Sequence, residues 1–507
     1  MKKNLLILML GVFLCYSCLD DTGNYSYSEL TPIEIDSSGM LAAYRVTQAD
    51  YLVIDPQVKQ GVDDSNLAYE WRIFQGSPQP NEETGKVVDD VVGKKRKLNY
   101  KVETPIGNYS LSLKVFDKSN GVFETIVRPL TVESFAPAGM MVMHGDADSC
   151  DVSILVNNRI ISDASKDEVL HNVFSTTNGH RVDGAPGMVG FTWNGPRVYV
   201  GTHGGKGGCL AKASNLGFVC DYAEMFEETL GGTNIDFQSC QTNGADWWMV
   251  NAGKVHYVQG GMPSFIQFGI AAWGESYYAE PYIATLAARG YSRGVFYDRI
   301  GRRFLWCDAS MMVQKFKPAG ATAAFDMGNV GKDMVYAEHG VDKKYYCVMR
   351  DPDSQTAYSL YECDLSAQDD GNRGIGKYDL SGCEGLADAR GYTFGKHNKL
   401  FFYASDTEIK LCNFGSGNTS ETVYTLPAEL VDAGYKISMI NLFAVYLGGS
   451  ITSESGKNLY IGVYNESSED GKLLECPIVV TSGAILADQV KTYDGFKKIT
   501  HLSYKNQ

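Results

Sequence analysis

The sequence lacks the short motifs that identify most hydrolases, metalloproteases and nucleotide-binding enzymes. It contains no HExxH, no GxSxG, no GxxxxGK followed by Ser or Thr, and no GxGxxG behind an expected strand. Of its 12 cysteines, Cys15 and Cys18 near the N-terminus stand at CxxC spacing, and the other ten include no CxxC pair and no zinc-ribbon spacing. We therefore predict no catalytic residue, no metal site and no cofactor. The alternative is an enzyme, a hydrolase or lyase of an extracellular polymer, whose catalytic groups follow no short motif.

The sequence also has fewer basic than acidic residues, and it has few long apolar runs. The chain has 45 Lys and Arg against 60 Asp and Glu, which gives a formal net charge of −15. Such a surface repels the phosphate backbone of nucleic acids, so we expect no nucleic-acid partner. Beyond the first residues, no stretch approaches the run of about 18 apolar residues that suggests a membrane-spanning helix.

The N-terminus has the parts of a secretory leader. A pair of lysines supplies the positive charge, and residues 5–14 form an apolar stretch too short to cross a bilayer. Ser17 offers the small residue before a cleavage site, which makes Cys18 the first residue of the mature chain. A cysteine in this place resembles the signal of a bacterial lipoprotein, so we predict a leader over residues 1–17 and lipidation of Cys18. A secreted protein with a free N-terminal cysteine is the alternative.

Two acidic residues, Asp20 and Asp21, follow this cysteine almost at once. They stand in a polar stretch, residues 18–28, that is typical of a flexible tether. The sequence CLDD resembles the export signal that sends lipoproteins of the Bacteroidetes to the outer face of the outer membrane. The resemblance implies a protein that is held at the membrane by lipid alone and faces the cell exterior. Acidic residues that only keep the tether solvated are the alternative.

Residues 29–136 show the short alternating runs of an all-β domain. In YSLSLKV, the side chains of Leu111, Leu113 and Val115 fall on one face of a strand, the period-2 pattern of a half-buried sheet. Trp71 stands in the middle of another run, where sandwich domains bury an aromatic side chain. Six or seven such runs within this stretch predict an immunoglobulin-like sandwich.

Two motifs in this stretch resemble a known family. Tyr69-Glu70-Trp71 and the later GNYSLSLKVFD look like the YxW and GxYxVxLxVxD strands of PKD-type sandwiches. Together with CLDDTGNYSY and the chain length, they make the sequence similar to the PKD-like family lipoproteins of the Bacteroidetes. The genes of that family usually lie beside those of a SusC/SusD-type, TonB-dependent outer-membrane importer. The resemblance implies a non-catalytic accessory subunit that captures a nutrient, a glycan or a peptide, for the importer. A purely structural subunit of the importer complex is the alternative.

Residues 137–507 show a repeated pattern of two strands joined by a turn. Seven such hairpins begin 48 to 59 residues apart, at residues 139, 197, 246, 294, 344, 399 and 458. This period predicts a seven-bladed β-propeller, because hairpins that cannot bury both faces alone do so by stacking around an axis. The last segment, GFKKITHLSYK, is expected to add an outer strand to the first blade and close the ring. A six- or eight-bladed ring, or a large irregular sandwich, is the alternative.

Aromatic side chains in the expected propeller are the candidates for ligand binding, because their flat faces bury much area at little entropic cost. Residues 264–291 are longer than a hairpin connection needs, and long insertions between blades often carry function. The candidates are Trp273, Tyr277, Tyr278 and Tyr282 in this stretch, and the adjacent Trp247 and Trp248. Packing of these rings inside the propeller is the alternative.

Cysteines and histidines give weaker signals. Cys209 and Cys220 could form a disulfide, whereas most other cysteines stand in apolar strands and are expected to behave as small buried hydrophobic residues. His144 and His203 fall in strands of the first two blades, where they are expected to be hydrogen-bonded core or rim residues rather than metal ligands. The acidic stretch HGDADSCD, which begins at His144, is expected to form a hairpin turn and not a calcium loop, because the glycine and glutamate of that loop are missing.

Overall fold

The structure is a computed structural model of the chain. It describes residues 32–48, 50–59, 64–76, 87–133, 136–162, 164, 167–192, 197–227, 235–243, 246–259, 267–285, 294–308, 310–367, 369–447 and 450–506. Cys18, Asp20 and Asp21, the residues predicted for lipidation and export, lie outside these ranges. The chain divides between Glu133 and Ser134 into two compact units. No helix within the ranges above is long and apolar enough to cross a membrane.

The first unit is a β-sandwich. Its strands are β1 (Glu34–Asp36), β2 (Tyr44–Thr47), β3 (Tyr51–Ile54), β4 (Gln57–Lys59), β5 (Leu67–Phe74), β6 (Asp89–Gly93), β7 (Leu98–Lys101), β8 (Gly107–Asp117) and β9 (Phe123–Glu133). The main sheet has the order β2-β9-β8-β5-β6, in which β2 and β9 are parallel and the other neighbours antiparallel. The pairs β1-β4 and β3-β7 form two small sheets beside it.

The core of the sandwich follows the alternating pattern of its strands. Leu111, Leu113 and Val115 in β8 are all buried, as the period-2 pattern predicts. Trp71 in β5 is fully buried among them, and its indole N–H donates to the carbonyl of Lys95 at 3.0 Å. Because a buried indole needs a hydrogen-bond acceptor, this contact fixes the ring in the core. The predicted sandwich is therefore confirmed.

The second unit consists mainly of seven sheets of three to five strands in the described residues. We number them as blades 1 to 7. From the centre outward, blade 1 has β39 (Lys498–Lys505), β10 (Gly139–Gly145), β11 (Ser149–Val156) and β12 (Glu168–Leu170), with β13 (Val182–Asp183) also beside β11. Blade 2 has β14 (Ala185–Thr192), β15 (Arg197–His203), β16 (Gly208–Lys212) and β17 (Phe218–Asp221). Blade 3 has β18 (Phe237–Asn243), β19 (Asp246–Asn251) and β20 (Lys254–Gln259).

The remaining blades have four strands each. Blade 4 has β21 (Ala279–Ala284), β22 (Gly294–Asp298), β23 (Arg303–Cys307) and β24 (Gln314–Lys315). Blade 5 has β25 (Asp333–His339), β26 (Tyr345–Arg350), β27 (Tyr358–Cys363) and β28 (Gly374–Asp379), and blade 6 has β29 (Gly391–Phe394), β30 (Leu400–Ala404), β31 (Glu408–Asn413) and β32 (Ser420–Thr425). Blade 7 has β33 (Lys436–Leu442), β36 (Asn458–Asn465), β37 (Asp470–Pro477) and β38 (Lys491–Phe496). A small ribbon, β34 (Tyr446–Leu447) with β35 (Ser450–Ile451), and two short helices, α2 (Val173–Asn178) and α3 (Ala428–Asp432), lie in the connections.

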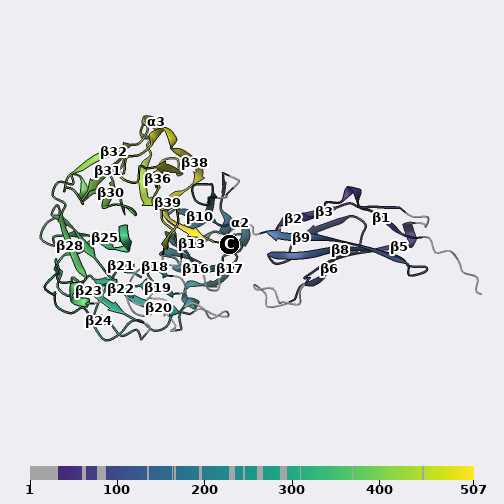
Figure 1. Ribbon diagram of the computed structural model, residues 1–507, viewed down its shortest axis with the longest axis horizontal. Helices are drawn as coiled ribbons and strands as arrows, with labels where there is room; N and C mark the ends of the chain where they lie inside the picture. The colour runs from purple at the N-terminus through teal and green to yellow at the C-terminus, as the bar shows by residue number, and fades with distance from the viewer. Residues whose placement is uncertain are drawn as a thin grey trace, which may run out of the picture. The chain divides into compact units, whose positions relative to one another are not determined.

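The seven sheets surround a central axis as the blades of a propeller (Figure 1). The inner strands form the ring, because β14, β18, β21, β25, β29, β33 and β39 each contact the next and β39 contacts β14. Every residue of β10, β22 and β30 is buried, since the middle strands of a blade pack against neighbouring blades on both faces. The prediction of an all-β chain with a seven-bladed propeller is confirmed.

The predicted hairpins and the closing strand have different outcomes. Each of the seven predicted hairpins forms the two strands next to the inner strand of one blade. The last segment does join the first blade, but β39 is its inner strand and not the outer strand that we predicted. The reason lies in the order of the chain. Every other blade begins with its inner strand, whereas the chain enters blade 1 at β10, so the missing strand of that blade is the inner one.

The ten described cysteines are all unpaired and buried, so the interpretation of most of them as small hydrophobic residues is confirmed. The disulfide suggested between Cys209 and Cys220 is absent in this structure. Cys209 in β16 faces Asp221, and Leu210 faces Cys220 in β17. Because successive residues of a strand point to opposite faces, the two thiols lie on opposite faces of blade 2. Cys209 packs toward blade 1 and Cys220 toward blade 3.

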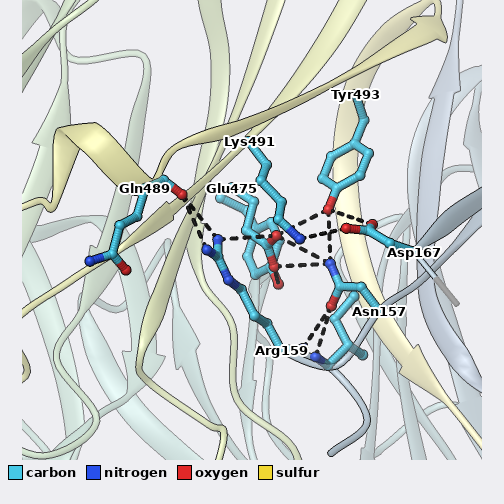
Figure 2. Close-up of polar contacts among 9 residues, drawn as sticks. Asn157, Arg159, Asp167, Glu475, Gln489, Lys491 and Tyr493 are labelled. Carbon is cyan, nitrogen blue, oxygen red and sulfur yellow. Dashed lines mark hydrogen bonds and ion pairs between the residues drawn. The ribbon is translucent and has the colours of Figure 1, made fainter. Parts of the chain in front are cut away.

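Blades 7 and 1 are joined by one buried carboxylate (Figure 2). Glu475 in β37 is fully buried, and it accepts hydrogen bonds from the Tyr460 hydroxyl at 2.7 Å and from the Asn157 amide at 3.1 Å. The Tyr493 hydroxyl donates to the same carboxylate at 3.1 Å, and the Arg159 guanidinium lies 3.4 Å from it. Asn157 and Arg159 follow β11 of blade 1, whereas the other three residues belong to blade 7.

Blade 5 repeats this arrangement toward blade 6. Glu362 in β27 accepts from the hydroxyls of Tyr346 at 3.2 Å and Tyr378 at 2.5 Å, and Lys399 from the next blade donates to it at 2.8 Å. The registers agree, because Glu362 pairs with Tyr346 as Glu475 pairs with Tyr460. A buried glutamate with two tyrosines and a donor from the following blade is thus a recurrent contact between blades of this propeller.

We expect Glu475→Ala to lower the free energy of unfolding of the propeller by about 3 kcal/mol. The substitution leaves the buried Tyr460 hydroxyl without its acceptor, at a cost of about 1–3 kcal/mol, and it also removes the bonds that Glu475 accepts from the Asn157 amide and the Tyr493 hydroxyl. Urea unfolding followed by tryptophan fluorescence measures the effect. Glu421→Ala, at an exposed position of β32, is the matched control and should change stability by less than about 0.5 kcal/mol. An equal effect of the two substitutions would contradict this role for Glu475.

Candidate functional site

The inner strands of all seven blades line a channel of about 1140 Å³ along the propeller axis. Its walls carry aromatic rings, neutral polar groups and a few charged groups. The lining residues are Met188, Phe191, His203, Gln238, Gln241, Pro281, Tyr282, Ile283, Thr285, Tyr336, Ala337, Glu338, His339, Tyr345, Arg390, Gly391, Tyr392, Lys396, Ser438, Met439, Ile440, Asn441, Leu442, Phe443, Ala444, Val445, Thr500, His501, Leu502, Ser503 and Tyr504. A cavity of this size, with apolar and polar groups in its walls, is large enough for a small-molecule ligand.

Three tyrosines from consecutive blades form an arc on one wall of the channel. Tyr282 in β21 and Tyr336 in β25 meet edge to face, with ring centroids 5.4 Å apart. Tyr336 and Tyr392 in β29 are stacked at 5.5 Å. Burial raises the pKa of Tyr282 and Tyr392 to about 12, so both hydroxyls stay protonated at neutral pH. The arc therefore offers aromatic surface with neutral hydroxyl groups.

The charged groups of the lining are paired with one another or with a neighbour. Lys396, which is almost fully buried, forms an ion pair with Glu338 and donates to the carbonyl of His339 at 2.9 Å. Glu338 also accepts from the Thr393 hydroxyl at 3.0 Å and from a backbone N–H at 3.0 Å. Arg390 forms an ion pair with Asp406 at 2.8 Å. Each formal charge among the described lining residues is thus in an ion pair, and Asp406 is shared between Arg390 and Lys436.

Two buried polar atoms of the lining have no hydrogen-bond partner among the described residues. They are Nε2 of His339 and the hydroxyl of Tyr345, on neighbouring strands of blade 5, with ring centroids 5.0 Å apart. Nδ1 of His339 donates to the carbonyl of Lys343 at 3.0 Å, which leaves Nε2 as an acceptor. Burial, with a smaller effect of the Lys396 charge, lowers the pKa of His339 to about 4, so the ring is neutral. Buried polar atoms without a partner are uncommon and are a signal of function.

The structure separates the aromatic residues that the sequence grouped together. Of the candidates, Tyr282 lines the channel. Trp273 is 51% exposed at the outer side of blade 4, where its backbone pairs with the segment around Met312. Tyr277 is buried in the interior between blades 3 and 4, and its hydroxyl donates to a carbonyl at 3.0 Å. Tyr278 is half-buried, accepts from Gln238 at 3.1 Å and stacks with a guanidinium.

Trp247 and Trp248 are both fully buried in β19. As adjacent residues of a strand they point to opposite faces of blade 3. Trp247 packs with residues of blades 2 and 3, and Trp248 packs with residues of blades 3 and 4. Their faces are therefore occupied by the neighbouring blades, and neither lies near a surface that a ligand can reach.

The histidines and the acidic turn have structural surroundings. His144 is buried in β10, and its ring lies 2.8 Å from the Ser153 hydroxyl. His203 lies at the end of β15, exposed at the channel rim. Asp146 accepts from two backbone N–H groups of the turn and from Arg181, as expected of an acidic hairpin turn. No group of three or more metal-ligating side chains occurs in the part of the chain that the structure covers.

Most channel residues were missed at the level of sequence. Tyr336 and Tyr392 stand in the short inner strands that precede the predicted hairpins, whereas the pattern search recognised the more apolar middle strands. A usable signal exists in the sequence. The segments DMVYAEH and GYTF each come shortly before a predicted hairpin, and each carries a tyrosine that lines the channel.

Comparison with known protein families gives one match, to the N-terminal third of the chain. A model of the PKD-like family matches residues 18–186. This region contains the described sandwich and continues into blade 1 of the propeller. The predicted similarity to the PKD-like family is confirmed over this region. No match was found among curated proteins.

Solved structures that resemble the chain include several β-propeller proteins. A quinonprotein alcohol dehydrogenase-like protein from Bacteroides thetaiotaomicron is 11% identical, with 94% of this chain and 99% of that chain covered and a TM-score of 0.46. PorZ, a surface component of the type-IX secretion system of Porphyromonas gingivalis, is 11% identical, with 80% and 54% covered and a TM-score of 0.36. The WD40 domain of SCAP from fission yeast is 6% identical, with 71% and 77% covered and a TM-score of 0.35. Because these TM-scores are below 0.5, the assignment of the fold rests on the sheet order described above.

Proposed function

We propose that this protein is a non-catalytic binding subunit that captures a nutrient, a glycan or a peptide, in its propeller channel. The channel is the observation on which the proposal depends. It combines a volume of about 1140 Å³ with aromatic rings and polar groups from all seven blades. These are the properties of cavities that hold small molecules or chain ends of polymers.

The arrangement of carboxylates in the channel supports binding over hydrolysis. A glycosidase needs two carboxyl groups that face one substrate, about 5–9.5 Å apart. Glu338 is the one carboxylate among the described lining residues. It is engaged by Lys396, by the Thr393 hydroxyl and by a backbone N–H, so its oxygens are not free to exchange a proton with a substrate.

The N-terminal sequence supports a location at the cell surface. In this proposal Cys18 carries the lipid anchor, and Asp20 and Asp21 direct the protein to the outer face of the outer membrane. Several acyl chains on one cysteine anchor a protein stably, since each buried methylene contributes about 0.8 kcal/mol. The match to the PKD-like family supports a partnership with a SusC/SusD-type importer, to which the propeller passes its ligand.

A depletion experiment tests the binding function against its rivals. The purified mature chain is dialysed to equilibrium against pools of oligosaccharides and of casein peptides. Loss from solution is then measured together with product formation by chromatography and mass spectrometry. We expect a compound to be depleted without new products. Formation of shorter products would make the protein an enzyme, and depletion of nothing would leave it a structural subunit; either result contradicts the proposal.

A further inference from the structure

We propose that the ligand of the channel is a neutral carbohydrate, bound through its hydroxyl groups by the amides of Gln241 and Asn441. This inference rests on the proposed function, and it chooses between the two classes of nutrient. Gln241 lies in β18 of blade 3 and Asn441 in β33 of blade 7, and both line the channel.

Both amides are available to a ligand. Each side chain is half-buried in the channel wall, and neither has a side-chain hydrogen bond in the described part of the chain. A side-chain amide presents two donors and a carbonyl acceptor. A sugar hydroxyl both donates and accepts, so amides of this kind match a polyol without the need for any charge.

The charges of the channel argue against a peptide and against an acidic glycan. A peptide with free ends, or a uronic acid, places at least one formal charge in the channel. Burying a charge without a partner is unfavourable. Glu338 and Lys396 already neutralise each other, and Arg390 is paired with Asp406, which lies outside the lining and also pairs with Lys436. The part of the described lining around Glu338 and Lys396 therefore has no spare charge to pair with such a ligand.

Two further neutral groups fit the same class of ligand. The hydroxyl of Tyr345 and Nε2 of His339 border the channel without a hydrogen-bond partner in the residues that the structure covers. Both atoms are buried, so a ligand reaches either of them only when a covering side chain moves. The rings of Tyr336 and Tyr392, which also line the channel, offer apolar surface for the C–H face of a sugar ring.

The test uses a double variant, Gln241→Ala with Asn441→Ala, and a matched control. The control, Gln314→Ala, removes an amide from β24, the outermost strand of blade 4. The side chain of Gln314 also has no side-chain hydrogen bond in the described residues, and it does not line the channel. Isothermal titration then measures the affinity of each protein for neutral oligosaccharides of glucose, mannose, galactose and xylose, for oligogalacturonate and for casein peptides. A melting curve of each variant checks the fold.

We expect a neutral oligosaccharide to bind, and the double variant to bind it at least tenfold more weakly than the wild type and the control do. Its melting temperature should stay within about 2 °C of the wild type, because no hydrogen bond of the fold is lost. Equal affinity of the double variant and the control would overturn this inference. Binding of peptides or oligogalacturonate in place of neutral sugars would also overturn it, while the proposed function would stand. Binding of none of these compounds would contradict the proposed function itself.

Discussion

A chain that ends at Lys497 should fail to form the propeller. It lacks β39, which pairs along its length with β10 and contacts the inner strands of blades 2 and 7. Ile499 and Leu502 of β39 are buried between blades 7 and 1. Loss of two such side chains costs about 2–5 kcal/mol each, and the backbone hydrogen bonds of the ladder add about 1 kcal/mol each. The total is comparable to the whole stability of a domain, about 5–15 kcal/mol.

Near-ultraviolet circular dichroism and thermal unfolding measure this effect. The shortened chain should lose the cooperative transition of the propeller, while a chain that ends at Lys505 keeps it. A synthetic peptide of residues 496–507 supplies β39 in trans and should restore part of the signal, because the free edge of β10 is a template for strand addition. A shortened chain with an unchanged transition would show that β39 does not close the ring.

Cys18→Ser should release the protein from the membrane almost completely. The described residues contain no helix that could hold it there, and in our proposal the acyl chains on Cys18 are the anchor. Labelling of growing cells with a fatty-acid analogue, followed by separation of membrane and soluble fractions, measures the change. The wild type should be labelled and sedimented with membranes, and the variant should be unlabelled and soluble.

Cys15→Ser is the matched control, because Cys15 is expected to leave with the leader. It should keep both the label and the membrane location. Replacement of Asp20 and Asp21 by Ala separates anchoring from export: the label should remain, but protease added to intact cells should no longer degrade the protein. Membrane-bound, labelled Cys18→Ser protein would contradict the assignment of the anchor.

The architecture of the propeller was accessible from the sequence because its middle strands have a strong physical signal. Strands that are buried on both faces need continuous apolar runs, and GVFYD and LFFYA show them clearly. The role of β39 could be predicted only in part from the sequence. Its β-branched residues Ile499 and Thr500 indicate a strand, but the sequence does not say which side of β10 it takes.

The channel was less accessible, for a reason that lies in the geometry of propellers. A ligand site on the axis takes one or two residues from each of seven inner strands, so its members are spread from Met188 to Tyr504. No local spacing joins such residues. Local patterns instead favoured clustered aromatics such as Trp247 and Trp248, and clustering in a strand of a blade indicates packing between blades. Tyr282 is both a candidate predicted from the sequence and a channel residue, because it stands in the inner strand β21.

The central claim, that the channel holds the ligand, is tested most directly by blocking it. Ser503 lines the channel from β39 and is half-buried, so Ser503→Trp fills part of the lumen without replacing a core residue. Equilibrium dialysis of the wild type and the blocked variant against the oligosaccharide and peptide pools is the measurement. We predict that the variant keeps the melting curve of the wild type and depletes nothing. A folded Ser503→Trp protein that binds as well as the wild type would place the site elsewhere and contradict the account.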